Sequence, residues 1–113
     1  MYDLEKELSK LNDKSSINDV QEYINKMLKT RGFEGQSKQE IMLLLTEEIG
    51  ELAKEVRKST NMKIDQKESR KDELSDEIAD VFIYILSMCT ESNIDLLQAF
   101  INKENKNMKR VWK

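Results

Sequence analysis

Two stretches decide the fold of this chain: KQEIMLLLTEEIGELAKEVRK at residues 38–58 and DELSDEIADVFIYILSMCT at residues 72–90. In each stretch, apolar residues recur at the three- and four-residue spacing of an amphipathic helix. The first apolar stripe consists of Ile41, Leu45, Ile49, Leu52 and Val56, and the second of Leu74, Ile78, Val81, Phe82, Ile85 and Cys89. Because a polar connection of roughly 15 residues (57–71) joins the stretches, they are predicted to form an antiparallel hairpin.

Each predicted helix also carries acids along one edge of its apolar stripe. The two edge rows are Leu44, Glu48, Glu51 and Glu55 on the first helix, and Glu73, Glu77, Asp80 and Tyr84 on the second. At about 100° per residue, both rows are displaced from their stripes in the same rotational sense. Antiparallel packing therefore places both rows on one side of the seam. The carboxylates predicted to converge there are Glu48, Glu51, Glu77 and Asp80.

A carboxylate within an apolar helical run costs several kcal/mol unless something compensates its charge. The chain contains no histidine, and few cations lie near these acids in the sequence. A hard divalent cation with oxygen ligands is the expected compensator. The alternative is a solvated helix face, since charged residues make up 36% of the chain and acidic rows also arise by chance.

Composition favours a single all-α domain. The 113 residues include no proline and only three glycines, which argues against a turn-rich β fold. Besides the hairpin, the pattern predicts a helix that begins at Ile17, after an N-cap in the pair Ser15-Ser16, and stops at Gly32. It also predicts a last helix that is capped by Ser92 or Asn93. Residues 1–14 are predicted to be an extension or a short helix. The expected architecture is a four-helix bundle.

Charge and cysteine content narrow the class of protein further. The net charge of −3 gives no case for a nucleic-acid polymer as partner, although residues 103–113 carry five basic residues against one acid, Glu104. Cys89 is the single cysteine, so an internal disulfide is excluded and a reducing cytoplasm is expected. No apolar run approaches the length of a membrane span, so neither membrane insertion nor secretion is expected.

The two acidic motifs resemble a known signature. Glu47-Glu48-Ile49-Gly50-Glu51, followed about 25 residues later by Glu77-Ile78-Ala79-Asp80, resembles the EExxE…ExxD motif of the MazG-like nucleotide pyrophosphohydrolases. Lys103, Asn107 and Arg110, followed by Val111-Trp112, resemble the K-x3-N-x2-R ending of that family. The resemblance covers residues 17–112.

This resemblance implies an all-α NTP pyrophosphatase that hydrolyses an NTP or dNTP to the monophosphate and pyrophosphate with Mg²⁺, or Mn²⁺ as a substitute. At matching positions, it implies that Glu48, Glu51, Glu77 and Asp80 hold the metal, with Glu47 as a further ligand or base. Phosphoanhydride chemistry itself suggests that Glu47 or Glu73 accepts a proton from water. Lys103 and Arg110 are candidates for binding phosphates, Asn107 for binding the base or sugar, and Phe33, Tyr84 and Trp112 for stacking.

Two alternatives and one assembly follow from the same residues. A non-catalytic helical module whose acidic face binds a basic partner would need no metal. A di-iron carboxylate bundle uses Glu-x-x-His pairs, and the absence of histidine argues against it. Large apolar groups such as Met88, Phe82, Phe100 and Ile101 are many for so small a domain, so a homodimer or a tetramer formed as a dimer of dimers is expected.

Overall fold

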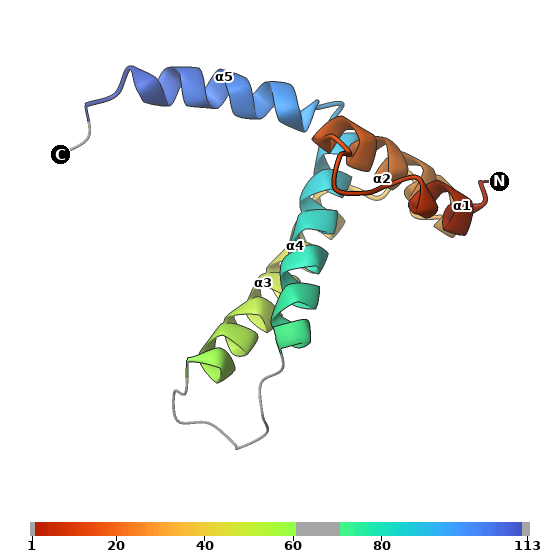
Figure 1. The fold of residues 1–113 in the computed structure, drawn as a ribbon, viewed down its shortest axis with the longest axis horizontal. Coiled ribbons are helices and arrows are strands. Elements are labelled where there is room, and N and C mark those ends of the chain that lie inside the picture. The colour runs from red at the N-terminus through yellow and green to blue at the C-terminus, as the bar shows by residue number, and fades with distance from the viewer. Residues whose placement is uncertain (1, 61–70, 112–113) are drawn as a thin grey trace. The chain divides into compact units, whose positions relative to one another are not determined.

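The computed structural model describes residues 2–60 and 71–111, with no account of the side chains of residues 71 and 72. Trp112, one of the candidate stacking residues, lies outside this range. The described residues form helices and contain no strand, which confirms the predicted all-α class. Figure 1 shows the helices α1 (Leu4–Ser9), α2 (Ile17–Arg31), α3 (Lys38–Ser59), α4 (Lys71–Glu91) and α5 (Leu96–Met108). None of the described helices has the length and apolar character needed to cross a membrane.

Contacts divide the chain into two compact units. The first unit comprises residues 1–35 and 89–113, and thus contains α1, α2, the last residues of α4, and α5. The second comprises residues 36–88, with α3 and most of α4. The assignment of the whole chain to one domain stays a prediction.

In the first unit, α2 begins and ends where the sequence predicts. Ser16 and Asp19 form a capping box, in which each side chain accepts a hydrogen bond from the other residue's backbone N–H. Gly32 ends the helix in the left-handed conformation with φ of 78°, and the N–H of Phe33 then reaches the carbonyl of Leu28 at 2.8 Å. The buried residues of α2 are Ile24, Met27 and Leu28. The short helix α1 is tied to α2 by an ion pair between Glu7 and Lys26 at 3.2 Å.

The turn between α4 and α5 differs from the prediction in its capping residue. Asn93 adopts a φ of 55° and ends α4, because the N–H of Ile94 can then bond the carbonyl of Cys89 at 2.9 Å. Asp95 is the N-cap of α5, and its carboxylate accepts from the N–H of Gln98 at 3.0 Å. The prediction of Ser92 or Asn93 as the N-cap was therefore wrong, since Asn93 serves to terminate the preceding helix.

In the second unit, α3 and α4 run side by side in opposite directions, as the predicted hairpin requires (Figure 1). Ser37 caps α3 by accepting from the N–H of Glu40 at 3.1 Å. The two best-buried side chains of this unit are Ile41 on α3, at 1% exposure, and Leu86 on α4, at 0%. Burial of aliphatic groups such as these is favourable for folding.

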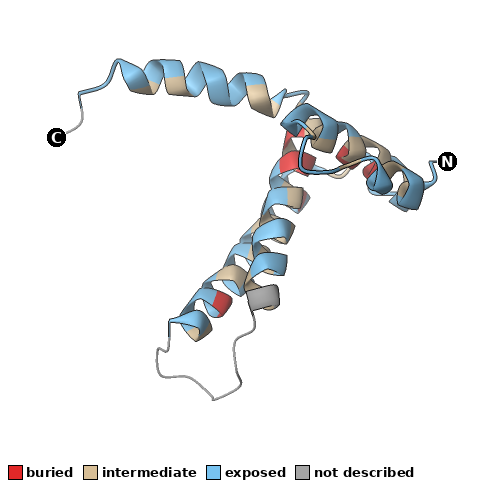
Figure 2. Cartoon of the chain, viewed as in Figure 1, coloured by how far each residue is buried: buried red, intermediate tan, exposed pale blue. Residues whose placement is uncertain are grey.

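The buried faces of α3 and α4 do not coincide with the predicted apolar stripes. Ile41, Leu45 and Leu52 are buried or half-buried, but Ile49 and Val56 are exposed. On α4, Leu74 and Val81 are half-buried, whereas the three stripe residues Ile78, Phe82 and Ile85 are exposed. Pale blue marks exposed residues along both helices (Figure 2), and the exposed residues of the hairpin include Ile49, Val56, Ile78, Phe82 and Ile85. Each helix is thus rotated so that its acidic edge takes part in the contact, and a share of its apolar stripe faces away from it.

Truncation of Leu86 to alanine should lower the free energy of unfolding by about 2–5 kcal/mol, because it leaves a cavity at a fully buried position. Leu43→Ala is the matched control, since Leu43 is 67% exposed and should change stability by less than about 0.5 kcal/mol. Urea denaturation of both variants measures the difference. Equal losses in the two variants would contradict the described packing of α3 against α4.

Candidate metal centre

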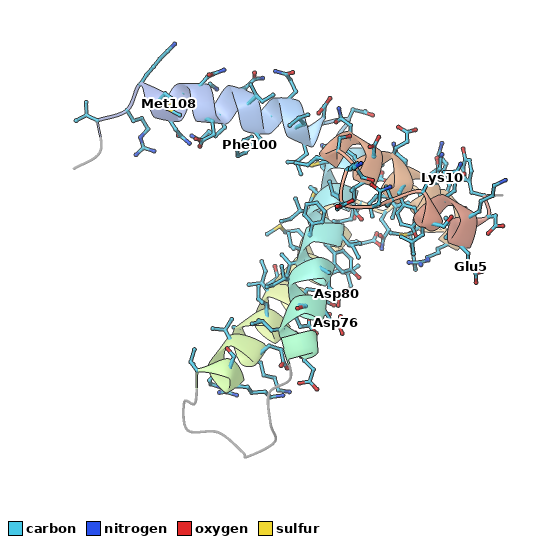
Figure 3. All side chains as sticks on the ribbon, viewed as in Figure 1. Glu5, Lys10, Asp76, Asp80, Phe100 and Met108 are labelled. Carbon is cyan, nitrogen blue, oxygen red and sulfur yellow. The ribbon has the colours of Figure 1, made fainter. Side chains whose placement is uncertain are left out.

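Three acids from two helices meet within the second unit. Glu48 belongs to α3, and Glu77 and Asp80, three residues apart and hence on one helical face, belong to α4. One carboxylate oxygen from each of Glu48, Glu77 and Asp80 lies within 4.8 Å of the other two. All three residues are half-buried. Figure 3 labels Asp80 on α4, one turn beyond Asp76. We refer to Glu48, Glu77 and Asp80 as the acid cluster.

Glu77 is the most perturbed member of the acid cluster. Burial, a hydrogen bond with the carboxyl of Glu48 and the charges of Glu48, Asp80 and Glu51 raise the pKa of Glu77 to about 7. Its Oε2 atom is buried and has no hydrogen-bond partner among the residues that the structure describes. A carboxylate held among other acids in this way is stabilised either by a proton or by a cation.

The acid cluster fits a hard divalent cation. Its three donor groups are all carboxylates, which are the ligands that Mg²⁺ and Ca²⁺ prefer. Ion pairs join Glu7 to Lys10 and Lys26, and Glu55 to Lys58. Among the described residues, the buried Oε2 of Glu77 accepts no hydrogen bond, and a metal ion would supply positive charge beside it.

The other acids of the predicted site lie around the acid cluster. Glu51 is exposed and outside the group of three, yet its charge contributes to the raised pKa of Glu77. Glu47 is also exposed, and Glu73 is half-buried on α4. Glu55, which had no predicted role, is 6% exposed and bonds Lys58 at 3.3 Å. The sequence signal for this pair is the Glu–Lys spacing of three residues on one helix.

Tyr84 lies one helical turn beyond Asp80 on α4 and is half-buried. Burial, followed by the charges of Glu48, Asp80 and Glu47, raises the pKa of the Tyr84 hydroxyl. The hydroxyl thus stays protonated at neutral pH and can donate a hydrogen bond. The interaction with three acids puts Tyr84 in the same electrostatic environment as the acid cluster, as its place in the predicted row requires.

The remaining predicted residues belong to the first unit. Lys103 is exposed on α5, and Arg110 follows the end of that helix. The Nδ2 atom of Asn107 donates to Glu104 at 2.8 Å, while its Oδ1 is buried without a partner. Phe33 follows α2 and is 48% exposed. The glutamate partner of Asn107 was not predicted, although Glu104 precedes it by three residues on the same helix.

Comparison with known proteins adds a family to this geometry. The model of the MazG nucleotide pyrophosphohydrolase domain matches residues 36–112. The matched range contains α3, α4 and α5, and therefore every acid of the cluster, whereas α1 and α2 precede it. Among curated proteins, no similar sequence was found.

The raised pKa of Glu77 predicts how the stability of the metal-free protein depends on pH. The folded protein holds this proton with a pKa of about 7, against 4.5 for an ordinary glutamate. The stabilisation is therefore fully present below the lower value and is lost as the pH rises through the upper one. In chelator, the Tm should fall over this range in wild type and fall less in Glu77→Gln. Parallel Tm profiles for the two proteins would contradict the described environment of Glu77.

Proposed function

Because the chain belongs to the MazG nucleotide pyrophosphohydrolase family, we propose that it hydrolyses a nucleoside or deoxynucleoside triphosphate to the monophosphate and pyrophosphate. The observation that carries this proposal is the meeting of Glu48, Glu77 and Asp80, with oxygens within 4.8 Å of one another. Acids brought this close repel one another, so their convergence is better explained by a bound cation than by a contribution to stability.

Mg²⁺ is the proposed cofactor, with Mn²⁺ as a substitute. Glu48, Glu77 and Asp80 would hold the ion, and Glu51 would be a further ligand because its charge already reaches Glu77. When bound, magnesium neutralises charge on the phosphates and makes a coordinated water more acidic. The oxygen-only donor set supports this choice over a softer transition metal.

The protein's own residues would orient the nucleotide and take up a proton. Water attacks a phosphorus atom of the phosphoanhydride, the bond to the bridging oxygen breaks, and pyrophosphate leaves. Glu47 is proposed to accept the proton of that water, because it is exposed and acts on Tyr84 together with the acid cluster. Glu73 is the second candidate. Tyr84, with its hydroxyl protonated, is proposed to contact the sugar or base.

Lys103, Asn107 and Arg110 are proposed to bind the rest of the substrate. Their spacing of four and three residues places them along one side of α5 and its extension. An ammonium and a guanidinium group match phosphate oxygens, and the planar fork of arginine can bind two at once. The unpartnered Oδ1 of Asn107 supports a polar ligand, since a buried amide oxygen without a hydrogen bond is costly.

The exposed apolar face of the second unit supports the proposal of a homodimer. This face consists of Ile49, Val56, Ile78, Phe82 and Ile85, with exposed fractions from 37% to 53%. Several large apolar side chains exposed on two adjacent helices are typical of an interface. A second copy carries an equal face, so a two-fold contact would cover both, and a dimer of dimers could then form through Phe100 and Ile101 of α5. The cytoplasmic location and the expected absence of a nucleic-acid partner stay predictions.

Asp80→Asn should reduce pyrophosphate release by about 100-fold or more, because it removes a charged metal ligand. The measurement is release of pyrophosphate from a panel of NTPs and dNTPs with and without Mg²⁺. Asp76→Asn is the matched control, since Asp76 is an exposed acid on the same helix and lies outside the acid cluster. Lys103→Ala should raise KM and leave the magnesium dependence unchanged.

The same variants separate the enzyme from the non-catalytic interaction module. Mg²⁺ binds only the folded state and should raise the Tm of wild type, and it should raise that of Asp80→Asn less. The Asp80→Asn fold should survive, because the change removes one of several repelling charges. Unchanged pyrophosphate release in Asp80→Asn, with no magnesium shift in wild type, would favour the module with an acidic face for a basic partner.

The assembly can be tested with one charge placed on the apolar face. Ile85→Lys should shift the chain from dimer to monomer in sedimentation at micromolar concentration, because a dimer would bury an unpaired ammonium group. Met108→Lys is the control, since Met108 lies on α5 and is 79% exposed. A wild-type chain that sediments only as a 13.3 kDa monomer would refute the dimer.

A further inference from the structure

The helix α5 depends on few contacts within the first unit. None of its residues is buried, whereas α2 buries three. Its apolar residues Phe100 and Ile101 are 59% and 42% exposed, and the labelled Phe100 and Met108 in Figure 3 both belong to this helix. A helix with so little buried surface is weakly restrained by packing, so specific hydrogen bonds at its start gain importance.

Gln21 on α2 makes two such hydrogen bonds to the segment that opens α5. Its Nε2 donates to the carbonyl of Ile94 at 2.7 Å, and its Oε1 accepts from the N–H of Leu96 at 3.1 Å. Leu96 is the first residue of α5, so its N–H has no partner within the helix. A single planar amide thus satisfies one donor and one acceptor on either side of the cap residue Asp95 and fixes the segment in two directions.

A cavity beside Gln21 shows how little else fills this corner. It has a volume of about 520 Å³ and lies between α2 and the turn after α4, with Asn25, Thr90 and Asn93 among its lining residues. A second cavity of about 430 Å³ shares these three residues. Open space adjoins the turn, so besides the half-buried Leu96 and Leu97 the two bonds of Gln21 are a specific link between α2 and the start of α5.

We propose that Gln21 is a positioning residue for substrate binding: it sets the direction in which α5 leaves α2 and thereby the placement of Lys103 and Asn107. The proposal rests on the proposed function, in which these α5 residues bind the nucleotide. Gln21 itself touches neither substrate nor metal in this scheme. It lies outside the matched residues 36–112, so the family match does not assign it a role.

Three variants test this role in the full chain. Gln21→Ala removes both bonds, and Gln21→Glu keeps the acceptor for Leu96 but places a second oxygen against the carbonyl of Ile94. Gln98→Ala is the control, because Gln98 bonds only Asn102 at 3.0 Å through its side-chain amide, within α5. The measurements are hydrogen exchange of the backbone amides from 96 to 102, KM and kcat for pyrophosphate release, and the magnesium shift of the Tm.

Both Gln21 variants should speed exchange at Leu96 and in the first turn of α5, and raise KM roughly fivefold or more, as loss of hydrogen bonds implies. The value of kcat should stay within about twofold, because the change affects binding in ground and transition state alike. The magnesium shift should equal that of wild type, and Gln98→Ala should change none of these values. If the Gln21 substitutions only destabilised the fold, the Tm of these variants would fall, and KM would not rise selectively while kcat stayed constant.

Two results would overturn the proposal. Unchanged exchange at Leu96 in Gln21→Ala would show that the amide does not hold α5, and faster exchange with unchanged KM would show that the position of α5 does not matter for the substrate. A wild-type chain that releases no pyrophosphate from any nucleotide would instead refute the proposed function. In that case the exchange experiment still decides whether Gln21 fixes α5.

Discussion

The repulsion among Glu48, Glu77 and Asp80 is the interaction on which the second unit depends. Three carboxylates with oxygens within 4.8 Å of one another repel when they carry charge. The pKa of Glu77, raised to about 7, expresses this conflict, because near neutral pH a proton takes the place of a cation. The hairpin of α3 and α4 must therefore be held together by other groups. Ile41 on α3 and Leu86 on α4, each at most 1% exposed, are the most deeply buried apolar groups of the unit, and their burial favours folding.

Bringing acids to the contact between α3 and α4 has a consequence for the apolar residues. A helix offers one face to its neighbour, and the acidic edge occupies part of that face. Ile49, Ile78 and Phe82 consequently lie exposed, although they belong to regular amphipathic stripes. The site and the apolar surface are two results of one rotation of the helices. This surface is available to a partner, and a second copy of the chain is the partner we propose.

The first unit combines a small apolar core, to which Ile24, Met27 and Leu28 belong, with directional polar contacts between its helices. Glu7 joins α1 to α2 through Lys26, and Gln21 joins α2 to the start of α5. Such contacts are directional, so they can set the orientation of a helix that buries little surface. A hydrophobic contact of the same size would resist separation but would permit sliding.

The sequence by itself determined the main helices and their order. The three- and four-residue spacing of apolar residues, Gly32 as a stop signal and Ser16 as a cap are local features, and local features can be read from neighbours in the chain. The meeting of Glu48 with Glu77 and Asp80 was also predictable, because it follows from the periods of two helices and an antiparallel connection. Only the tertiary structure decided that Asn93 ends α4 and leaves the cap of α5 to Asp95. It also decided that the stripe residues Ile49, Ile78 and Phe82 stay exposed. The bonds from Gln21 to Ile94 and Leu96, more than 70 residues away, belong to the same class. These features depend on how helices rotate and meet, and several rotations are compatible with the same periodic pattern.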